Sequence, residues 1–561
     1  MGAKIGPDQD KELTPYAGRW VARVRGKIVA QGATADQAAE SARQIRSEEA
    51  PEIVFVPDTQ TFFDNPLFEL ILNNLRPDQE IFLVGGAVRD FLLRRETHDL
   101  DFTVSEGGMK TARRISKTLK GAFYPLDEEK DVGRVILTAA DGTREILDFS
   151  SYRKNSLEAD LAARDFSINA LAYNLRTREF IDLVGGLVDL KSGVIRACSD
   201  STFTDDPVRI LRAVRFASSL GYAIQYESKK LIKESVKLLS QTSPERIRDE
   251  LFKILDGPKP SSAILALELL GGLSFVLPEL LELKGVEQPV PHVLDVWSHT
   301  LKAVDHLGTI LTVLAPHYDD ENHQDLMSGL VTAKLGRYRS SLSDHISSSL
   351  TIERSHRALL VYSTLFHDVG KPNKFIKEDG IVKFHGHDEE GSAIAVGRAI
   401  KLRLSNSEMD YVRMMVSNHM RMIYHINRYQ QEGKTPARRA VYRFFRDTGS
   451  AGVDLCLLAL ADLRATYENE LTQQAWSAAL DVVKIFLENW WEKRDEAIAP
   501  PQLVNGDDLI LTFHLKPGPF IGKILEAIKE AQAVGEIRTK EEALGLADKL
   551  LADKNTAGSV Q

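Results

Sequence analysis

A pair of glycines, Gly85-Gly86, joins a short apolar segment to a helical one, and this junction constrains the fold most strongly. Ile81-Phe82-Leu83-Val84 is typical of a buried strand, and the apolar residues after Ala87 recur at helical spacing. Glycine allows the backbone to come close to a bound group, and the free N–H groups at a helix start favour anions. The sequence therefore predicts a strand–turn–helix unit with room for an anionic ligand.

Two carboxylates, Asp99 and Asp101, follow this unit. Residues i and i+2 of a strand point to one face, so both carboxylates are expected on the same side. Paired hard oxygen ligands suit Mg²⁺, which also binds substrate phosphates. A glycine turn alone is usually only a turn, and an Asp-x-Asp pair alone is usually a solvated edge. Together, and with Arg89, they predict a site for a nucleoside triphosphate and its magnesium ion.

Two later segments offer further groups for this site. Asp148 lies in another strand-like run and adds a third carboxylate if that strand lies beside the one carrying Asp101; otherwise it is a surface residue at a strand end. Arg164 could hold a triphosphate because arginine matches phosphate oxygens in bidentate fashion, although an Arg-Asp pair is more often a surface ion pair. Asp165 and Asn169, spaced i and i+4, could brace one helix start.

A further helix is predicted from Pro207, because proline suits the first helical position and Asp206 would then be its N-cap. Arginines recur on its polar side at Arg209, Arg212 and Arg215. Cytosine and adenine both present an amino donor beside a ring-nitrogen acceptor, which a carboxylate and a neighbouring arginine can read. An Asp206–Arg209 pair could therefore select CTP and ATP, with Arg212 and Arg215 left for phosphate or for bracing the pair.

Length and composition limit the classes of protein. The 561 residues are enough for several domains. No apolar run approaches the ~20 residues of a membrane span, and the first residues lack the apolar core of a signal peptide. Cys198 and Cys456 argue against a disulfide framework, so a reducing cytoplasm is the expected location. The net charge is -9, so a nucleic-acid partner would require basic residues gathered on one surface.

The pattern of apolar and polar residues predicts five regions. They are a small hairpin-and-helix unit of unknown role at 11–57, an α/β or α+β domain at 60–190, a mainly helical segment at 191–285, a histidine-rich helical domain at 292–465 and a helical tail at 466–550. Thr34 is a candidate N-cap for the helix of the first region. Within the histidine-rich domain, 315–350 is polar and serine-rich, which indicates an insertion of loop character.

The histidine-rich domain offers a second candidate metal site. Imidazole nitrogens and carboxylate oxygens are the ligands of catalytic divalent sites, although a lone buried histidine is more often a satisfied core residue. The groups available are the adjacent pair His367-Asp368, His299 before it, and His385, His387, His419 and Asp462 after it. His317 and His323, in the polar insertion, are expected to be solvated.

These motifs, in this order, resemble the class II tRNA nucleotidyltransferases (CCA-adding enzymes) and the closely similar bacterial poly(A) polymerases. The matching segments are Gly85-Gly86-Ala87-Val88-Arg89-Asp90, Asp99-Leu100-Asp101, Arg164-Asp165-Phe166-Ser167-Ile168-Asn169-Ala170, Asp205-Asp206-Pro207-Val208-Arg209-Ile210-Leu211-Arg212 and Ser243-Pro244-Glu245-Arg246-Ile247-Arg248-Asp249-Glu250. The resemblance covers 60–285 strongly and 495–550 less strongly. It implies an α+β head, polymerase-β-like and built on a mixed sheet, followed by mostly α-helical neck, body and tail domains.

The resemblance also implies roles for single residues. Asp99 and Asp101 would be the Mg²⁺ ligands. The nucleotide-binding residues would be Gly85, Gly86, Arg89, Arg164, Asp206, Arg209, Arg212 and Arg215. The chain departs from the family pattern at Ala163, where a second arginine is common, and at Asp205, where glutamate is common. Neither change removes a residue with an expected role.

The order His…His-Asp…Asp resembles the HD phosphohydrolase superfamily. This resemblance implies that His299, His367, Asp368 and Asp462 hold a divalent ion such as Mn²⁺, Ni²⁺ or Mg²⁺, and that His387 and His419 could complete a second metal. Some nucleotidyltransferases carry such a domain with phosphatase or cyclic phosphodiesterase activity, so the same activity could occur here. In the tail, Lys516 lies at a glycine turn before a helix and could hold RNA backbone together with Lys523; a plain packing element is the alternative.

The predicted function is the template-independent addition of C, C and A to the 3′ end of tRNA from CTP and ATP, with no membrane and no protein partner implied. Within the family, the alternatives are a poly(A) polymerase and an enzyme that adds only C or only A. Outside it, the alternatives are an HD metal phosphohydrolase with an RNA-binding head, and a regulatory RNA-binding scaffold with both sites idle.

Overall fold

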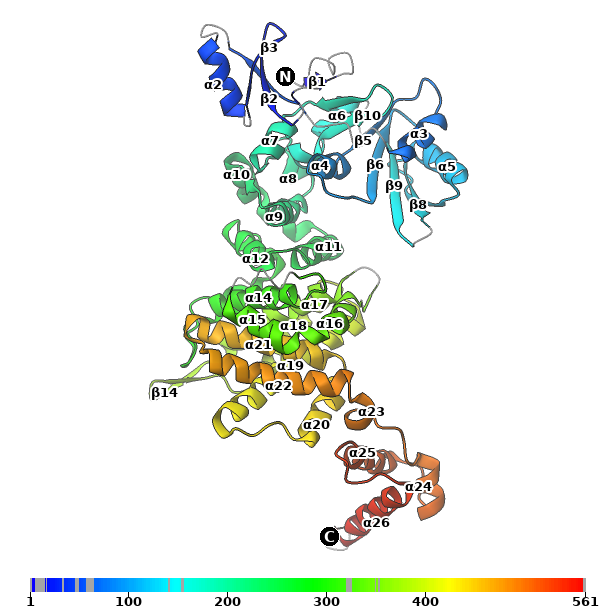
Figure 1. The fold of residues 1–561 in the computed structure, drawn as a ribbon, viewed down its shortest axis with the longest axis vertical. Helices are drawn as coiled ribbons and strands as arrows, with labels where there is room; N and C mark the ends of the chain where they lie inside the picture. Colours follow the sequence, from blue (N-terminus) through cyan, green and yellow to red (C-terminus); the bar gives the residue numbers. More distant parts are fainter. Residues whose placement is uncertain are drawn as a thin grey trace. The chain divides into compact units, whose positions relative to one another are not determined.

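The computed structural model describes residues 3–5, 16, 18–32, 35–45, 50–56, 65–139, 142–152, 156–318, 325–348, 350–351 and 354–557. The chain divides into two compact units, Met1–Thr242 and Ser243–Gln561 (Figure 1). The first unit holds a mixed sheet with helices, and the second is mostly helical, which confirms the predicted fold class. The division falls inside the predicted segment 191–285, and the other predicted domain limits stay predictions.

The main sheet of the first unit has the strand order β1-β11-β10-β5-β6-β9-β8-β7. Its strands are β1 (Ala3–Ile5), β5 (Ile81–Val84), β6 (Asp99–Val104), β7 (Ala122–Asp127), β8 (Val132–Thr138), β9 (Arg144–Ser151), β10 (Leu171–Asn174) and β11 (Glu179–Asp182). The β6–β9 pair is parallel and the other pairs are antiparallel. Strand β5 is buried along its whole length, as its apolar sequence predicts.

Aromatic packing fixes the half of the sheet that carries the carboxylates. Phe102 of β6 stacks on Phe149 of β9 with ring centroids 5.0 Å apart, and Phe68 of α3 (Pro66–Asn73) meets Phe102 edge-on. Helix α5 (Gly108–Leu119) packs on β8 and β9 beside them (Figure 1). Because Phe102 and Phe149 point into this core, the alternating residues of β6 and β9 point to the opposite face.

Shorter elements complete the first unit around the glycine turn. They are α4 (Gly86–Leu92), α6 (Leu157–Ala162), the 3₁₀ turn η2 (Ser167–Asn169), α7 (Gly186–Ser192), β12 (Val194–Ile195), α8 (Thr202–Asp205), α9 (Arg209–Leu220), β13 (Ala223–Ile224), α10 (Tyr226–Ser235) and η3 (Val236–Gln241). Helix α4 contacts β5, β6, β10 and η2. The glycine turn therefore lies at one end of the strands β5 and β6.

The N-terminal region forms the predicted hairpin, helix and strand. The hairpin consists of β2 (Trp20–Val24) and β3 (Lys27–Gly32), followed by α2 (Ala35–Ile45) and β4 (Glu52–Phe55), which pairs with β2. Ala38 and Ala42 of α2 pack against Trp20 and Ala22. Thr34, the candidate N-cap, lies outside the described residues.

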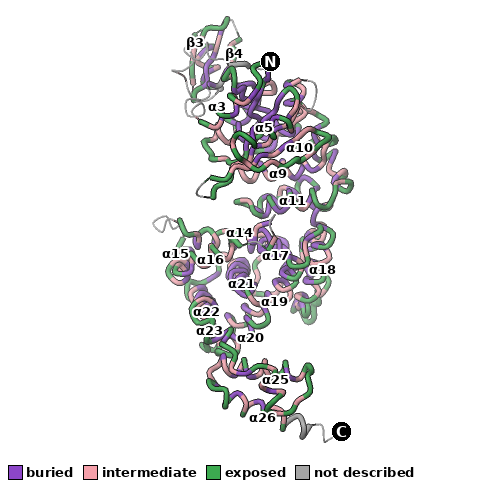
Figure 2. Tube along the Cα trace, turned by 90° about the vertical axis from the view of Figure 1, so that its right-hand side faces the viewer, coloured by how far each residue is buried: buried purple, intermediate pink, exposed green. Residues whose placement is uncertain are grey.

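Helices build the second unit. They are α11 (Pro244–Leu255), α12 (Pro260–Leu269), α13 (Leu273–Val276), η4 (Pro278–Leu283), α14 (Val296–Val313), α15 (Leu326–Leu335), η6 (Gly336–Tyr338), α16 (Arg339–Ser347), α17 (His356–Phe366), η7 (Pro372–Lys374), the hairpin β14 (Ile376–Glu378) and β15 (Ile381–Lys383), α18 (His387–Lys401), α19 (Asn406–Glu432), α20 (Arg438–Thr448), α21 (Ala451–Tyr467), η8 (Glu468–Glu470), α22 (Gln473–Trp491) and α23 (Arg494–Ala497). Helix α21 contacts α14, α19 and α22 and is buried almost throughout (Figure 2). It is the central helix of this bundle.

The tail consists of α24 (Gly506–Phe513), α25 (Pro519–Ala533) and α26 (Lys540–Ala557). These helices share a small apolar core that includes Leu509, Ile524 and Ala543. Among the described residues, no helix is long and apolar enough to cross a membrane.

The segment 315–350 differs from the prediction of a loop-like insertion, because it contains the helices α15 and α16. Val331, Leu335 and Leu342 of these helices are buried, and the Trp476 indole donates a hydrogen bond to the Met327 carbonyl. Burial of a few apolar side chains outweighs the weak helix propensity of the serines. His317 is exposed as predicted, and His323 lies outside the described residues.

Candidate functional site

The glycine turn brings an arginine and a carboxylate to the start of α4. Gly85 has a φ of +75°, a conformation that side-chain-bearing residues rarely adopt. A Cβ atom at Gly85 would lie 2.9 Å from Nη1 of Arg164 and 3.6 Å from Oδ2 of Asp101. The absence of a side chain at this position thus leaves room for both groups beside the first turn of the helix.

Three carboxylates lie on two neighbouring strands. Asp99 and Asp101 are exposed while Leu100 between them is buried, which confirms the predicted alternation on β6. Asp101 is paired in register with Asp148 on the parallel strand β9. Residues paired in register on neighbouring strands point to one face, so Asp148 joins the row, as the sequence suggested. Carboxylates gathered in this way offer the hard oxygen ligands that fit Mg²⁺.

The guanidinium group of Arg164 can bind an anion. Its Nη2 lies 3.2 Å from Oδ2 of Asp160, which is buried in α6. Its Nε atom is buried and has no hydrogen-bond partner within the part of the chain that the structure describes. A buried guanidinium donor without an acceptor is unfavourable, so a phosphate oxygen would satisfy it.

A chain of hydrogen bonds links the glycine-turn helix to α9. Nη1 of Arg89 donates to Oδ1 of Asn169 at 2.6 Å, and Nδ2 of Asn169 donates to Oδ1 of Asp165 at 3.0 Å, which confirms the predicted brace. Oδ2 of Asp165 accepts from Nε of Arg212 at 2.8 Å. Burial raises the pKa of Asp165, but the Arg212 charge and the bond from Asn169 outweigh it, so this pKa is lowered. The carboxylate therefore stays ionised between the two elements.

The phenyl ring of Phe216 on α9 is the meeting point of three arginines. The guanidinium carbon lies 4.9 Å from the ring centroid for Arg89, 5.6 Å for Arg212 and 4.3 Å for Arg215. Cation–π contact orients these side chains. The predicted arginine cluster of α9 is thus joined by Arg89 of α4.

Helix α9 begins at Arg209, two residues later than predicted, because Pro207 and Val208 form a turn. The prediction that Asp206 is the N-cap is therefore wrong: Val208 precedes the first turn of α9 and no described side chain caps it, while Oδ1 of Asp206 accepts from the Val208 amide at 3.3 Å within the turn. Nε of Arg209 lies 4.0 Å from Oδ2 of Asp206, and its Nη atoms donate to the carbonyls of Ala163 and Thr202. Asp206 and Arg209 are therefore neighbours, as the base-reading hypothesis requires.

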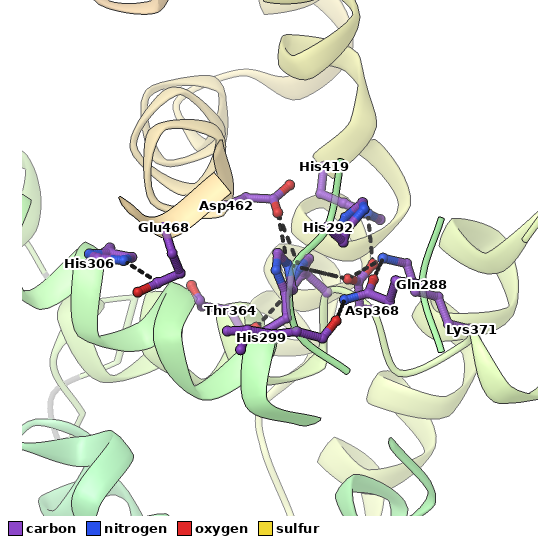
Figure 3. A network of polar contacts seen from close by, with 12 residues as sticks. Gln288, His292, His299, His306, Thr364, Asp368, Lys371, His419, Asp462 and Glu468 are labelled. Carbon is purple, nitrogen blue, oxygen red and sulfur yellow. Dashed lines mark hydrogen bonds and ion pairs between the residues drawn. The ribbon is translucent and has the colours of Figure 1, made fainter. Parts of the chain in front are cut away.

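The histidine-rich cluster of the second unit brings together all six predicted ligands (Figure 3). His299 of α14 lies 2.9 Å from Asp462 of α21, measured from Nε2 to Oδ1, and 3.7 Å from Oδ2 of Asp368. Nε2 of His367 lies 3.2 Å from Oδ2 of Asp368. The other Asp368 oxygen, Oδ1, lies 3.5 Å from Nε2 of His387 and 3.6 Å from Nε2 of His419. Asp368 thus stands between two sets of imidazoles.

The tautomers of three of these histidines are fixed by the backbone. The Nδ1 atoms of His367, His387 and His419 lie 2.7 to 2.8 Å from the carbonyls of the residues three positions earlier. An Nδ1–H that donates to a carbonyl leaves Nε2 with a lone pair, which is the arrangement of metal-ligating histidines. Nε2 of His367 and Nε2 of His299 are buried and make no well-aligned hydrogen bond among the described residues, although oxygens of Asp368 and Asp462 lie 3.2 and 2.9 Å from them. Imidazole nitrogens and carboxylate oxygens that converge in this way fit a divalent cation.

Electrostatics within this cluster keep its carboxylates ionised. Burial raises the pKa of Asp368, but the charges of His367 and Lys371 outweigh burial and hold it well below its usual value. Burial also raises the pKa of Asp462, but its contact with Nε2 of His299 at 2.9 Å outweighs burial and lowers it. Burial lowers the pKa of His419, whereas the charge of Asp368 outweighs burial at His367 and raises its pKa. A bound metal would take the place of the proton on His367, since ionised carboxylates and neutral imidazoles are the forms that bind metals.

Three residues of this cluster were not predicted. Nζ of Lys371 lies 2.6 Å from Oδ2 of Asp368 and 2.7 Å from Oε1 of Gln288. The ring of His292 lies 5.2 Å from that of His299, and burial, with the charge of Lys371, lowers its pKa to about 4. The i, i+3 spacing of Asp368 and Lys371 was a usable signal, whereas Gln288 and His292 lie in a loop without periodicity.

A second group of two histidines and an aspartate lies elsewhere in the second unit. Asp454 is fully buried and accepts from Nε2 of His345 at 3.0 Å and from Nε2 of His356 at 2.8 Å. The Nδ1 atom of His356 is buried and lacks a partner among the residues described. A metal at Nε2 would leave an unsatisfied N–H at this Nδ1, so the group fits a hydrogen-bonded triad better than a metal site.

Comparisons with known proteins match segments of both units. Residues 81–196 match the family described as Poly A polymerase head domain, and 221–283 match "Probable RNA and SrmB- binding site of polymerase A". Residues 453–547 match tRNA nucleotidyltransferase domain 2. The head-domain match and the row of carboxylates define the class of protein as a nucleotidyltransferase.

Two relatives indicate the family of nucleotidyltransferases to which the chain belongs. The A-adding tRNA nucleotidyltransferase of Deinococcus radiodurans is 32% identical over 471 residues, which are 82% of this chain and 93% of that protein. The CC-adding tRNA nucleotidyltransferase of Thermus thermophilus is 31% identical over 473 residues, 83% of this chain and 92% of that protein. The chain belongs to the tRNA nucleotidyltransferase family.

A solved structure shows the same fold. The CCA-adding enzyme of Thermotoga maritima, solved in complex with tRNA, aligns with a TM-score of 0.51 at 20% identity and covers 87% of this chain and 99% of that chain. The matched fold therefore extends over most of the chain.

Proposed function

We propose that this protein adds C, C and A to the 3′ end of tRNA from CTP and ATP at the site formed by Asp99, Asp101 and Arg164. The row of carboxylates on β6 and β9, beside the glycine turn with its unsatisfied Arg164 Nε, is the observation that carries the proposal. The relatives named A-adding, CC-adding and Multifunctional CCA protein support tRNA as the acceptor.

The reaction follows from these groups. The oxygen of the terminal 3′-hydroxyl bonds to the α-phosphorus of the nucleotide and its proton passes to solvent. The bond from that phosphorus to the bridging oxygen breaks, and pyrophosphate leaves with the electron pair. Asp99 and Asp101 would hold magnesium, which supplies Lewis-acid stabilisation of the charge that develops on phosphate oxygens. Arg164 binds and orients the triphosphate. Most of the acceleration comes from positioning and electrostatics.

Base selection is assigned to Asp206 and Arg209. The carboxylate of Asp206 accepts from the exocyclic amino group of cytosine or adenine, and Arg209 donates to the neighbouring ring nitrogen. A carbonyl at the same place, as in uracil and guanine, would face the carboxylate. Arg212, held by Asp165, and Arg215, on Phe216, brace the helix that carries Arg209.

The product profile tests the proposal. A tRNA transcript that lacks its CCA end is incubated with the protein, Mg²⁺ and each labelled triphosphate, alone and together. Two C additions, one A addition and then a stop are expected. Long A tails would show a poly(A) polymerase, and no incorporation would refute nucleotidyl transfer.

An enzyme that adds only A is the second candidate, because the A-adding relative of Deinococcus radiodurans is 32% identical over 93% of its length. It predicts that a transcript ending in CC is extended by A and that a transcript without CC is not extended by C. The same assay therefore separates the two candidates.

We further propose that the histidine-rich cluster holds a divalent cation and hydrolyses phosphoesters. The convergence of the Nε2 atoms of His299 and His367 on the ionised Asp368 and Asp462 supports a metal. Mn²⁺, Ni²⁺ or Mg²⁺ would supply an activated water at this position. Metal analysis of the full chain, compared with the variant Asp368→Ala, is expected to show a loss of bound metal; equal metal content in both would refute the site.

The location follows from the cysteines and from the proposed substrate. Cys198 and Cys456 are both free thiols, which supports a reducing compartment. The cytoplasm, where tRNA ends are completed, is the proposed location.

A further inference from the structure

The positively charged side chain of Arg134 lies in line with the carboxylates on the sheet. Arg134 of β8 is paired in register with Asp148 of β9, which is paired with Asp101 of β6. Residues at one register on neighbouring strands point to the same face, so the three side chains form a line across three strands. The sequence gives no hint of this arrangement, because Arg134 belongs to no motif.

The contact between Arg134 and Asp148 has two points. Nε of Arg134 donates to Oδ1 of Asp148 at 2.8 Å, and Nη2 donates to Oδ2 at 2.8 Å. A bidentate guanidinium–carboxylate pair fixes the orientation of the carboxylate, which a single contact does not. The hydrogen bond to Asp148, and the charges of Asp148, Asp99 and Asp101, raise the pKa of Arg134 against the effect of burial. All three carboxylates thus act on this guanidinium.

We propose that Arg134 is a positioning residue of the nucleotidyl-transfer site, which orients Asp148 as a hydrogen-bond acceptor and keeps it from closing on the divalent cation held by Asp99 and Asp101. Each Asp148 oxygen uses one acceptor direction for Arg134 and keeps another for a substrate hydroxyl. The positive charge also weakens the negative field that attracts the cation. The inference rests on the function proposed for this site.

Removal of Arg134 should therefore have two effects of opposite sign. Without the guanidinium, the three carboxylates attract a divalent cation more strongly, and Asp148 is free to turn toward it. The orientation of Asp148 is then lost, so transfer becomes slower. A merely structural role for Arg134 predicts instead that cation binding and transfer weaken together.

The experiment measures Mn²⁺ binding by electron paramagnetic resonance and, separately, the rate of CMP incorporation at saturating CTP. All chains carry Asp368→Ala so that the histidine-rich cluster contributes no signal. Arg134→Gln is expected to bind Mn²⁺ roughly fivefold more tightly and to transfer CMP about tenfold more slowly. Arg134→Lys, which keeps the charge but loses the two-point contact, is expected to bind Mn²⁺ normally and to transfer slowly.

Arg144→Gln is the matched control, because Arg144 is an exposed cation at the far end of the same strand pair, opposite Thr138. It should leave binding and rate unchanged. The double variant Arg134→Gln/Asp148→Asn should be no slower than Asp148→Asn, since both changes remove one interaction. Unchanged Mn²⁺ binding in Arg134→Gln, weaker binding, or additive rate losses would each overturn the inference. Persistent transfer in Asp101→Ala would instead refute the site itself.

Discussion

At the scale of the residue, Gly85 combines a strained backbone with a close approach of Arg164. Gly85→Ala should cost about 1 kcal/mol of stability from the positive φ and should displace Arg164 from the position where it lies 2.9 Å from the new Cβ. The KM for CTP is expected to rise about tenfold. Steady-state kinetics with a CCA-less tRNA measure this effect.

Gly26→Ala separates the two contributions, because Gly26 also has a φ of +75° but a Cβ there would meet no atom of the described residues within 4 Å. It should lose similar stability and keep its KM. Equal KM values for the Gly85→Ala variant and the native chain would show that Arg164 does not bind the triphosphate.

Asp454 is the residue whose ionisation most directly supports the helical bundle. Burial raises its pKa, but hydrogen bonds from His345 and His356 outweigh burial and lower it to about 2. A lowered folded-state pKa stabilises the fold above the unfolded value near 4, and this contribution is lost as the pH falls from about 4 to about 2. Asp454→Asn should cost about 3 kcal/mol at pH 7, because it removes the buried charge and replaces the acceptor of one imidazole by an amide donor.

His345 also stabilises the fold, but its contribution depends on pH in the opposite direction. Burial lowers its pKa, but the hydrogen bond to Asp454 outweighs burial and raises it above the usual 6.5. The stabilisation is therefore complete below pH 6.5 and is lost as the pH rises through the folded-state value. Urea unfolding at several pH values tests both residues, with the exposed Asp410→Asn as control. An unfolding free energy of Asp454→Asn equal to that of the native chain would contradict this account.

At the scale of the element, the hydrogen-bond chain Arg89–Asn169–Asp165–Arg212 couples α4 to α9. Asp165→Asn should loosen Arg212 and, through it, the start of α9 beside Arg209. Misincorporation of UMP relative to CMP is expected to rise about tenfold, while tRNA affinity stays within a factor of two. A competition assay with mixed triphosphates measures the ratio.

Asp205→Asn is a suitable control, since this carboxylate contacts Ser201 at the surface of α8. The Asp205→Asn variant should keep the native ratio of UMP to CMP incorporation. If Asp165→Asn also keeps it, the chain of hydrogen bonds has no part in base selection.

The elements that could be predicted from the sequence are those with short-range signals. Alternation placed Asp99 and Asp101 on one face of β6, and the i, i+4 spacing found the Asp165–Asn169 bond. The start of α9 was placed two residues too early, because Pro207 also suits a turn. Helices α15 and α16 could not be predicted, since burial of α15 against α14 and α22 and of α16 against α17 stabilises them. The partner of Asp148 depends on the register of β8 and β9, which no local pattern encodes.

At the scale of the whole molecule, ion pairs tie the tail to the helical bundle. Arg439 and Arg443 of α20 lie 3.0 and 2.7 Å from Glu530 of α25, and the Tyr442 hydroxyl donates to Glu526. Several charges around Glu530 form a network, which is stronger than isolated surface pairs. Glu530→Gln should loosen α25 and increase its hydrogen exchange about tenfold at low salt.

High salt should reduce the difference in hydrogen exchange between Glu530→Gln and the native chain, because it screens the exposed ion pairs of the native chain as well. Glu541→Gln, a change of the same charge in α26, serves as control. Identical exchange of α25 in Glu530→Gln and in the native chain would show that apolar packing alone docks the tail.

The central claim is that Asp99 and Asp101 carry nucleotidyl transfer, and Asp101→Ala tests it most directly. Single-turnover incorporation of labelled CMP into a CCA-less tRNA is compared with tRNA binding, with Asp78→Ala as control, since Asp78 is a surface carboxylate with a side chain 78% exposed. We predict a loss of about a thousandfold in rate, with tRNA affinity nearly intact and the control unaffected. Native rates in Asp101→Ala would contradict the account.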